Sequence, residues 1–161
     1  MAKILVSSCL LGFKVRYNGS NMPVLDKRFE KVILENEIIH FCPEVFAGLS
    51  IPRLPCEIYK GDGEDVLSGS AKVLCNNGLD LTKEFLTGAK KALDKCIKES
   101  ILCALLTESS PSCGSNLIYD GSFRGTKKPG KGVTAALLAK SKINVFSQHD
   151  IAKLIEYLNE H

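Results

Sequence analysis

Short apolar runs alternate with amphipathic stretches along the chain. Four runs have the length and composition of buried strands: Lys3–Ser8, Ile38–Phe41, Ile101–Leu106 and Ile143–Phe146. Apolar residues recur at helical spacing over 27–35, 82–99 and 133–140, and again from about His149. Strands that alternate with helices in this way form parallel sheets. The pattern predicts a single α/β domain over residues 1–161, with a central, mainly parallel sheet flanked by helices in a Rossmann-like arrangement.

The two clearest helices also have predicted faces and caps. In the helix over 82–99 one face collects the apolar side chains of Phe85, Leu86, Ala89, Leu93, Cys96 and Ile97. Asp80 or Thr82 can cap the start of this helix. Ser147 and Asp150 have the spacing of a capping box, which predicts that the last helix begins near His149.

Two stretches, Pro43–Ser70 and Ser109–Gly132, lack a long periodic pattern and are expected to be irregular. Long irregular connections inside a compact domain are uncommon and are often functional. In an open parallel sheet, ligands bind at the carboxyl ends of the strands, where such connections begin. We therefore expect the site at that edge of the sheet.

The composition narrows the possible partners. The chain has 161 residues, 45% of them hydrophobic and 24% charged, which is typical of a folded globular protein. Its net charge of +3 is too small to indicate binding to polymeric nucleic acid or to a membrane surface. No apolar run reaches the roughly 20 residues that a membrane-spanning helix needs. The pattern says nothing about the oligomeric state.

Seven cysteines are the unusual feature of the composition. Their odd number, their irregular spacing and the lack of a secretory segment argue against a disulfide framework, so we expect a cytoplasmic protein with reduced thiols. Cys96 and Cys103 lie at apolar positions and are expected to be small buried residues. Cys75 closes a short strand before an Asn-Asn-Gly turn, and Cys56 is expected to have no thiol partner.

Cys9, Cys42 and Cys113 follow the ends of three predicted strands, so their thiols can converge at one sheet edge. Structural zinc normally has four ligands, and neither a C-x-x-C pair nor a suitably placed histidine completes such a site. An iron–sulfur cluster held by three cysteines would leave one iron open to a substrate atom. On the pattern alone, three unrelated loop cysteines remain an alternative.

The segment from Gly125 to Lys131 fits the phosphate-binding pattern G-x-x-x-x-G-K, but Gly132 stands where serine or threonine should follow. Nucleotide hydrolysis is therefore not predicted. The loop either meets an anionic substrate group with its lysines and the amides of the following helix, or is simply solvated. Arg16 and Arg124 are likewise either substrate contacts or surface charges.

The sequences around the three cysteines resemble the thiouracil desulfidase (TudS-like) family. The matching segments are Ser8-Cys9-Leu10-Leu11-Gly12, Cys42-Pro43-Glu44, Ser110-Pro111-Ser112-Cys113-Gly114 and Gly132-Val133-Thr134-Ala135. Their order and spacing agree along nearly the whole chain, from Cys9 to Phe146. Asn18-Gly19-Ser20 and Phe46-Ala47 depart from the commoner family residues, which leaves the identity of the substrate open.

The resemblance implies an oxygen-sensitive [4Fe-4S] cluster held by Cys9, Cys42 and Cys113. It also implies removal of sulfur as hydrosulfide from a small thionated pyrimidine, without net redox change. The catalytic residues would be Glu44 and Ser110. An open iron is a soft sulfur acceptor, Glu44 is placed to activate water or move a proton, and Ser110 can orient that base.

Other interpretations stay open beside this one. Glu44 can be a loop carboxylate paired with Arg53, and Ser110 can be a turn former before Pro111. The protein can also be a non-enzymatic iron–sulfur or metal-binding module, or a metal-free cysteine-nucleophile enzyme. The last of these would want a histidine near the thiol, and the matching loops contain none.

Overall fold

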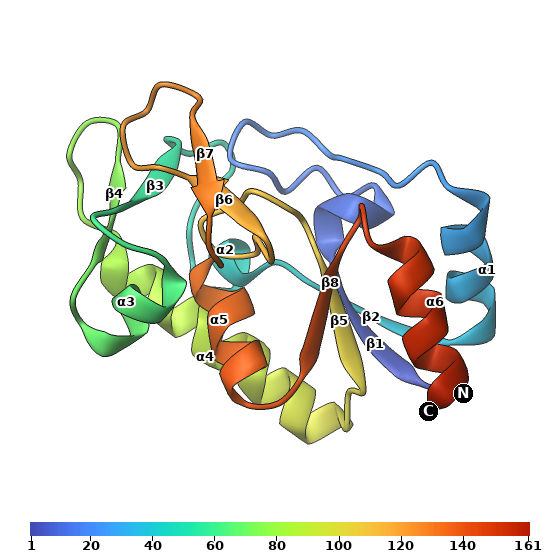
Figure 1. Ribbon diagram of the computed structural model, residues 1–161. Helices are drawn as coiled ribbons and strands as arrows, with labels where there is room; N and C mark the ends of the chain where they lie inside the picture. The colour runs from blue at the N-terminus through green and yellow to red at the C-terminus, as the bar shows by residue number, and fades with distance from the viewer.

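The computed structural model describes residues 1–161 and is built around a four-stranded sheet with the order β2-β1-β5-β8 (Figure 1). The strands are β1 (Lys3–Ser7), β2 (Glu37–Phe41), β5 (Cys103–Leu106) and β8 (Asn144–Ser147). Each lies within one or two residues of a predicted strand, and every neighbouring pair is parallel. The predicted α/β fold with a parallel central sheet is therefore confirmed.

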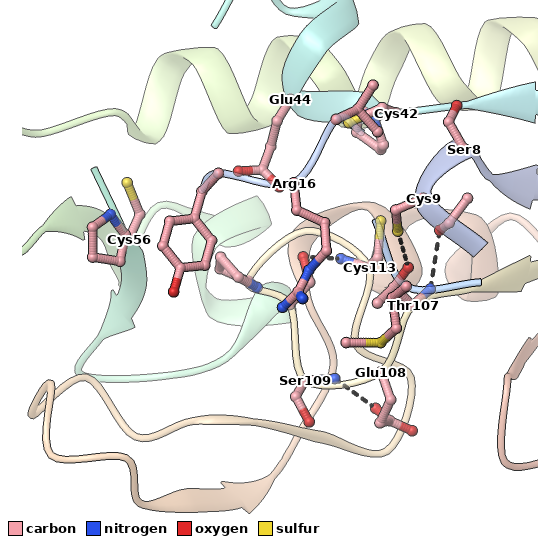
Figure 2. Close-up of a pocket in the computed structure, with 18 of the residues that line it drawn as sticks. Ser8, Cys9, Arg16, Cys42, Glu44, Cys56, Thr107, Glu108, Ser109 and Cys113 are labelled. Carbon is pink, nitrogen blue, oxygen red and sulfur yellow. Dashed lines mark hydrogen bonds between the residues drawn. The ribbon is translucent and has the colours of Figure 1, made fainter. Parts of the chain in front are cut away.

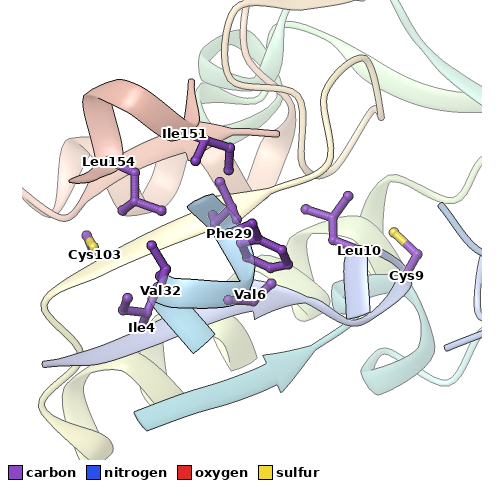
Figure 3. Packing of buried hydrophobic residues seen from close by; sticks show 10 residues of the cluster. Ile4, Val6, Cys9, Leu10, Phe29, Val32, Cys103, Ile151 and Leu154 are labelled. Carbon is purple, nitrogen blue, oxygen red and sulfur yellow. The ribbon is translucent and has the colours of Figure 1, made fainter. Parts of the chain in front are cut away.

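Helices cover both faces of the sheet (Figure 1). On one face are α1 (Lys27–Glu35) and α6 (Ile151–Glu160), and on the other are α4 (Thr82–Glu99) and α5 (Val133–Lys140). Figure 3 shows Ile4 and Val6 of β1 packed with Phe29 of α1 and Leu154 of α6. Leu5, between them in sequence, packs on the opposite face with α4 and α5. Because successive strand side chains alternate, one apolar run serves both layers.

The helix α4 has the predicted bounds and most of the predicted buried face, since Phe85, Ala89 and Cys96 are buried and Leu86 and Leu93 pack against the core. Gly88, Ala89 and Ala92 are buried, whereas Ile97 is 68% exposed and does not belong to the core. These small residues let α2 (Pro43–Phe46) and α5 approach α4, and a Cβ atom at Gly88 would overlap the carbonyl oxygen of Pro43. Gly88 thereby positions the segment that follows β2.

The ends of the helices only partly follow their predicted caps. The Asp80 carboxylate accepts the Thr82 N–H at 2.9 Å, as expected for the start of α4. The helix α6 begins at Ile151, two residues later than predicted. The Ser147 hydroxyl oxygen accepts the His149 N–H at 3.1 Å, so this serine stabilises a turn before the helix rather than its first turn.

The two stretches expected to be irregular contain short elements. The first holds α2, β3 (Cys56–Tyr59) and α3 (Gly63–Ser68), and the second holds β6 (Leu117–Tyr119) and β7 (Lys127–Pro129). β3 pairs with β4 (Lys72–Cys75), and β6 pairs with β7, both antiparallel. Elements of three to six residues are too short to establish a periodic pattern. None of the helices is both long and apolar enough to cross a membrane.

Candidate active site

A cavity of about 430 Å³ opens at the carboxyl ends of β2, β1 and β5. Its walls include all five residues singled out from the sequence: Cys9, Cys42, Glu44, Ser110 and Cys113. Figure 2 labels the three cysteines and Glu44. They come from three separate connections, each of which leaves the same edge of the parallel sheet. The topology thus brings these residues together at the edge where a site was expected.

The three cysteines occupy different local structures. Cys9 lies in the short 3-10 helix η1 (Ser8–Leu11), Cys42 immediately precedes α2, and Cys113 lies in the loop after β5. Cys9 and Cys113 are only 7% and 5% exposed. Burial raises the pKa of all three thiols. Each bare thiol is therefore protonated at neutral pH, and binding of a metal centre must release these protons.

The spacing of Cys9, Cys42 and Cys113 distinguishes a site for a single metal ion from a site for a cluster. No group of three Cys, His, Asp or Glu residues lies close enough together to bind a single metal ion. A zinc ion needs all its ligands within about 2.3 Å of one point, whereas cluster cysteines bond to separate irons and are spaced more widely. Three cysteines around one cavity, two of them buried, fit a cluster of this kind and do not fit a mononuclear site.

Glu44 is held firmly on the cavity wall. Its Oε1 atom lies 3.2 Å from Arg53 Nε, and its Oε2 atom accepts a hydrogen bond from the Ser112 hydroxyl at 3.2 Å. The side chains of Glu44 and Arg53 are 16% and 7% exposed. Arg53 also donates to the carbonyl oxygens of Ser50 and Val15. The ion pair considered from the sequence exists, and it fixes a carboxylate that faces the cavity.

The serine that contacts Glu44 is Ser112, which sequence reasoning did not single out. Ser110 contacts Ser112 instead, with the two Oγ atoms 3.0 Å apart. Because the Ser112 hydroxyl proton points to Glu44, Ser110 donates to Ser112, and the chain of hydrogen bonds runs from Ser110 through Ser112 to Glu44. Ser110 Oγ also accepts the N–H of Cys113 at 3.2 Å, which shapes the cysteine loop. Ser110 does not contact Glu44 directly, so its predicted orienting role would act through Ser112.

Glu108 organises the loop that carries Cys113. Its carboxylate accepts the N–H groups of Ser115, Asn116 and Leu117 at 2.9 to 3.0 Å. Burial alone would raise the pKa of Glu108, but these hydrogen bonds outweigh it and lower the pKa from 4.5 to about 2. A single acidic residue after a strand carries no sequence signal for this role.

Glu108→Gln is expected to destabilise the fold by roughly 1–2 kcal/mol at pH 7, since a neutral amide accepts these hydrogen bonds less well and solvent reaches part of the group. The folded pKa lies below the unfolded value, so the ionised carboxylate stabilises the protein fully above about pH 5 and loses this effect as the pH falls toward 2. Urea unfolding of both proteins between pH 3 and 7 measures the difference. If the difference in unfolding free energy between the two proteins is the same at every pH, this role of Glu108 is wrong.

The N-terminus of α5 supports the same loop. The N–H groups of Val133 and Thr134 donate to the carbonyl oxygens of Pro111 and Ser112, both at 2.8 Å. A Cβ atom at Gly132 would overlap the backbone of Ser112 and Cys113, so only glycine allows this approach. The helix amides considered for an anionic substrate group are therefore occupied by the protein itself, which leaves only the lysines of the loop for such a contact.

The basic residues considered from the sequence separate into two groups. Arg16 and Lys127 line the cavity, whereas Arg124 does not. The guanidinium of Arg16 points into the cavity (Figure 2) and takes part in none of the ion pairs of the structure. Arg16 thus offers unpaired hydrogen-bond donors to a bound molecule.

Comparison with known proteins agrees with this geometry. A family model described as 2-thiouracil desulfurase matches residues 4–150. The chain is 43% identical to the uncharacterized protein YbbK of Bacillus subtilis (strain 168) over 152 residues, which cover 94% of this chain and 99% of YbbK. It is also similar to the solved structure of the [4Fe-4S]-dependent thiouracil desulfidase TudS, with a TM-score of 0.89, 41% identity and complete coverage of both chains. The chain therefore belongs to the 2-thiouracil desulfurase family.

Proposed function

We propose that this protein removes sulfur from a small thionated pyrimidine as hydrosulfide, with a [4Fe-4S] cluster held by Cys9, Cys42 and Cys113. The observation that carries the proposal is the cavity that these three cysteines and Glu44 share, in a chain similar to TudS over its full length. The reaction exchanges the sulfur of C=S for the oxygen of water and releases hydrogen sulfide. No carbon changes its oxidation state, so the reaction requires no electron donor.

Three cysteine ligands leave one corner of such a cluster without a protein ligand. When bound, the cluster would supply a soft Lewis-acidic iron with affinity for the thiocarbonyl sulfur. The residues around it are left to orient the pyrimidine and to handle protons.

Glu44 is the proposed proton acceptor. Each of its oxygens has one hydrogen-bond partner in the protein, Arg53 for Oε1 and Ser112 for Oε2, and each keeps a second lone pair for water in the cavity. The carboxylate can therefore take a proton from the attacking water without losing its anchors. Ser110 and Ser112 support it as a polarised chain of hydroxyl groups.

Arg16 is the proposed contact for the exocyclic carbonyl oxygen of the pyrimidine. Its guanidinium reaches into the cavity and has no carboxylate partner. Such a group can donate hydrogen bonds to a carbonyl acceptor beside the thiocarbonyl. A metal-free cysteine nucleophile is less well supported, because burial raises the pKa of all three thiols and the partner of Cys9 is the Thr107 hydroxyl rather than a base.

Protein reconstituted with iron and sulfide under anaerobic conditions is expected to convert 2- or 4-thiouracil to uracil and hydrosulfide in equal amounts, with no reductant added. Chromatography of the bases and a colorimetric sulfide assay measure the two products. Protein without the cluster is the control and should be inactive. A need for reductant in every turnover would refute the hydrolytic reaction, and no turnover on any thiobase by cluster-loaded protein would favour a non-enzymatic module.

A further inference from the structure

Cys56 and Cys75 face each other across the antiparallel pair β3 and β4. Their Cα atoms are direct partners in the strand register. Their Sγ atoms lie 2.6 Å apart, and neither belongs to the group of three thiols proposed to hold the cluster. The expectation that Cys56 has no thiol partner is therefore wrong. The two cysteines are 19 positions apart in the sequence, with the helix α3 between them. Their pairing therefore gives no local sequence signal.

The strand register suits a covalent bond between the two sulfurs. The Asn76 N–H donates to the Pro55 carbonyl, and the Cys75 N–H donates to Leu79, so Cys56 and Cys75 form a non-hydrogen-bonded pair. Side chains approach most closely at such positions, where the Cα atoms lie about 4.5 Å apart. This separation falls within the range that disulfides accept. The backbone spacing of such a pair therefore permits a disulfide.

One of the two thiols is accessible from the cavity. Cys56 is 9% exposed and lines the cavity wall, whereas Cys75 is 3% exposed and does not line this cavity. In Figure 2, Cys56 lies at one end of the cavity and Cys9, Cys42 and Cys113 lie at the other. A small reagent in the cavity can thus reach Cys56, and Cys75 is positioned to react with whatever forms there.

We propose that Cys56 and Cys75 form a thiol–disulfide exchange site, which a low-molecular-weight disulfide such as oxidised glutathione converts to an intramolecular disulfide. The Cys56 thiolate attacks one sulfur of the reagent, whose S–S bond breaks and releases one thiolate with the electron pair. The Cys75 thiolate then attacks the Cys56 sulfur and releases the second thiol. Two protein thiols are oxidised, the reagent is reduced to two thiols, and an excess of reduced thiol reverses the exchange.

A disulfide between Cys56 and Cys75 would restrain the part of the cavity wall that positions Glu44. It ties β3 to β4 directly after the segment of Arg53 and Pro55, and Arg53 is the ion-pair partner of Glu44. It also closes a loop that contains α3. Closure of a loop of this length restricts the unfolded chain, and we expect the melting temperature to rise by roughly 5–10 °C. Burial and the neighbouring Cys75 raise the pKa of the Cys56 thiol, so the exchange is expected to be slow at neutral pH.

The test treats cluster-loaded protein anaerobically with excess oxidised glutathione, quenches it in acid and alkylates the remaining thiols before mass spectrometry. We expect the intact mass to fall by about two units before alkylation, because two thiol hydrogens are lost. We also expect a cross-linked peptide pair that joins Cys56 to Cys75, and dithiothreitol should reverse both changes.

Two variants serve as controls. Cys75→Ser should lose the intramolecular link and retain glutathione on Cys56, while Cys96→Ser, which removes a buried cysteine outside this pair, should form the link as the native protein does. Full alkylation of Cys56 and Cys75 in the treated native protein would overturn the proposal, as would a link between any other two cysteines. The test measures a mass and a peptide map, so its outcome does not depend on whether the protein has desulfidase activity.

Discussion

Replacement of Cys113 by serine is expected to abolish the iron–sulfur cluster and all desulfidase turnover. Only three protein ligands hold the proposed cluster, and a serine oxygen is a harder, more basic ligand than a thiolate. Cys9→Ser and Cys42→Ser should have the same effect. Iron and sulfide analysis of anaerobically reconstituted protein measures it, with about four of each per chain in the native protein.

Cys96→Ser is the matched control for these three variants. Cys96 is 2% exposed on the buried face of α4, away from the cavity. The substitution should cost roughly 1–3 kcal/mol of stability through burial of a hydroxyl group, while the brown colour and the iron content persist. If Cys96→Ser bleaches the protein as completely as Cys113→Ser, the assignment of the cluster ligands is wrong.

Glu44→Gln is expected to lower turnover about 10²- to 10⁴-fold while the cluster remains. Glutamine has nearly the same shape and can still accept a hydrogen bond, but its amide cannot take a proton from water. The amide oxygen can accept from Arg53, and the amide NH2 group can donate to a rotated Ser112 hydroxyl, so both partners can still orient the side chain. The measurement is the rate of thiouracil consumption, normalised to the iron content of each preparation.

Two serine variants separate proton transfer from orientation. Ser112→Ala removes the direct hydrogen bond to Glu44, and Ser110→Ala removes the hydroxyl behind it. If the serines only orient the carboxylate, both should slow turnover less than Glu44→Gln does. Native rates in Glu44→Gln would move the proton-transfer role to the serine chain or to bound water.

Much of the fold and part of the site could be predicted from local pattern. The four strands of the sheet and the bounds of α1, α4 and α5 follow from apolar periodicity, which depends on each segment alone. The convergence of Cys9, Cys42 and Cys113 follows from one further rule, that carboxyl ends of parallel strands share an edge. Family motifs then singled out Glu44 and Ser110, whose catalytic roles remain predictions.

The interactions between separate segments were beyond such reasoning. Ser112 rather than Ser110 contacts Glu44, because the direction of a side chain in a turn depends on how the turn packs against α5. Likewise, Glu108 binds backbone amides from a loop that follows it, and no local pattern indicates this. Both depend on the three-dimensional path of irregular backbone, which has no periodicity to be read.

By itself, then, the sequence determined the α/β class, the parallel sheet and the edge at which the site lies, since these depend on patterns repeated over many residues. Only the tertiary structure decided which side chains meet there. It ordered Glu44 between Arg53 and Ser112, left Arg16 unpaired in the cavity, and brought Cys56 opposite Cys75. Such contacts join residues distant in the chain, and their geometry is set by the packing of short elements whose sequences specify little locally.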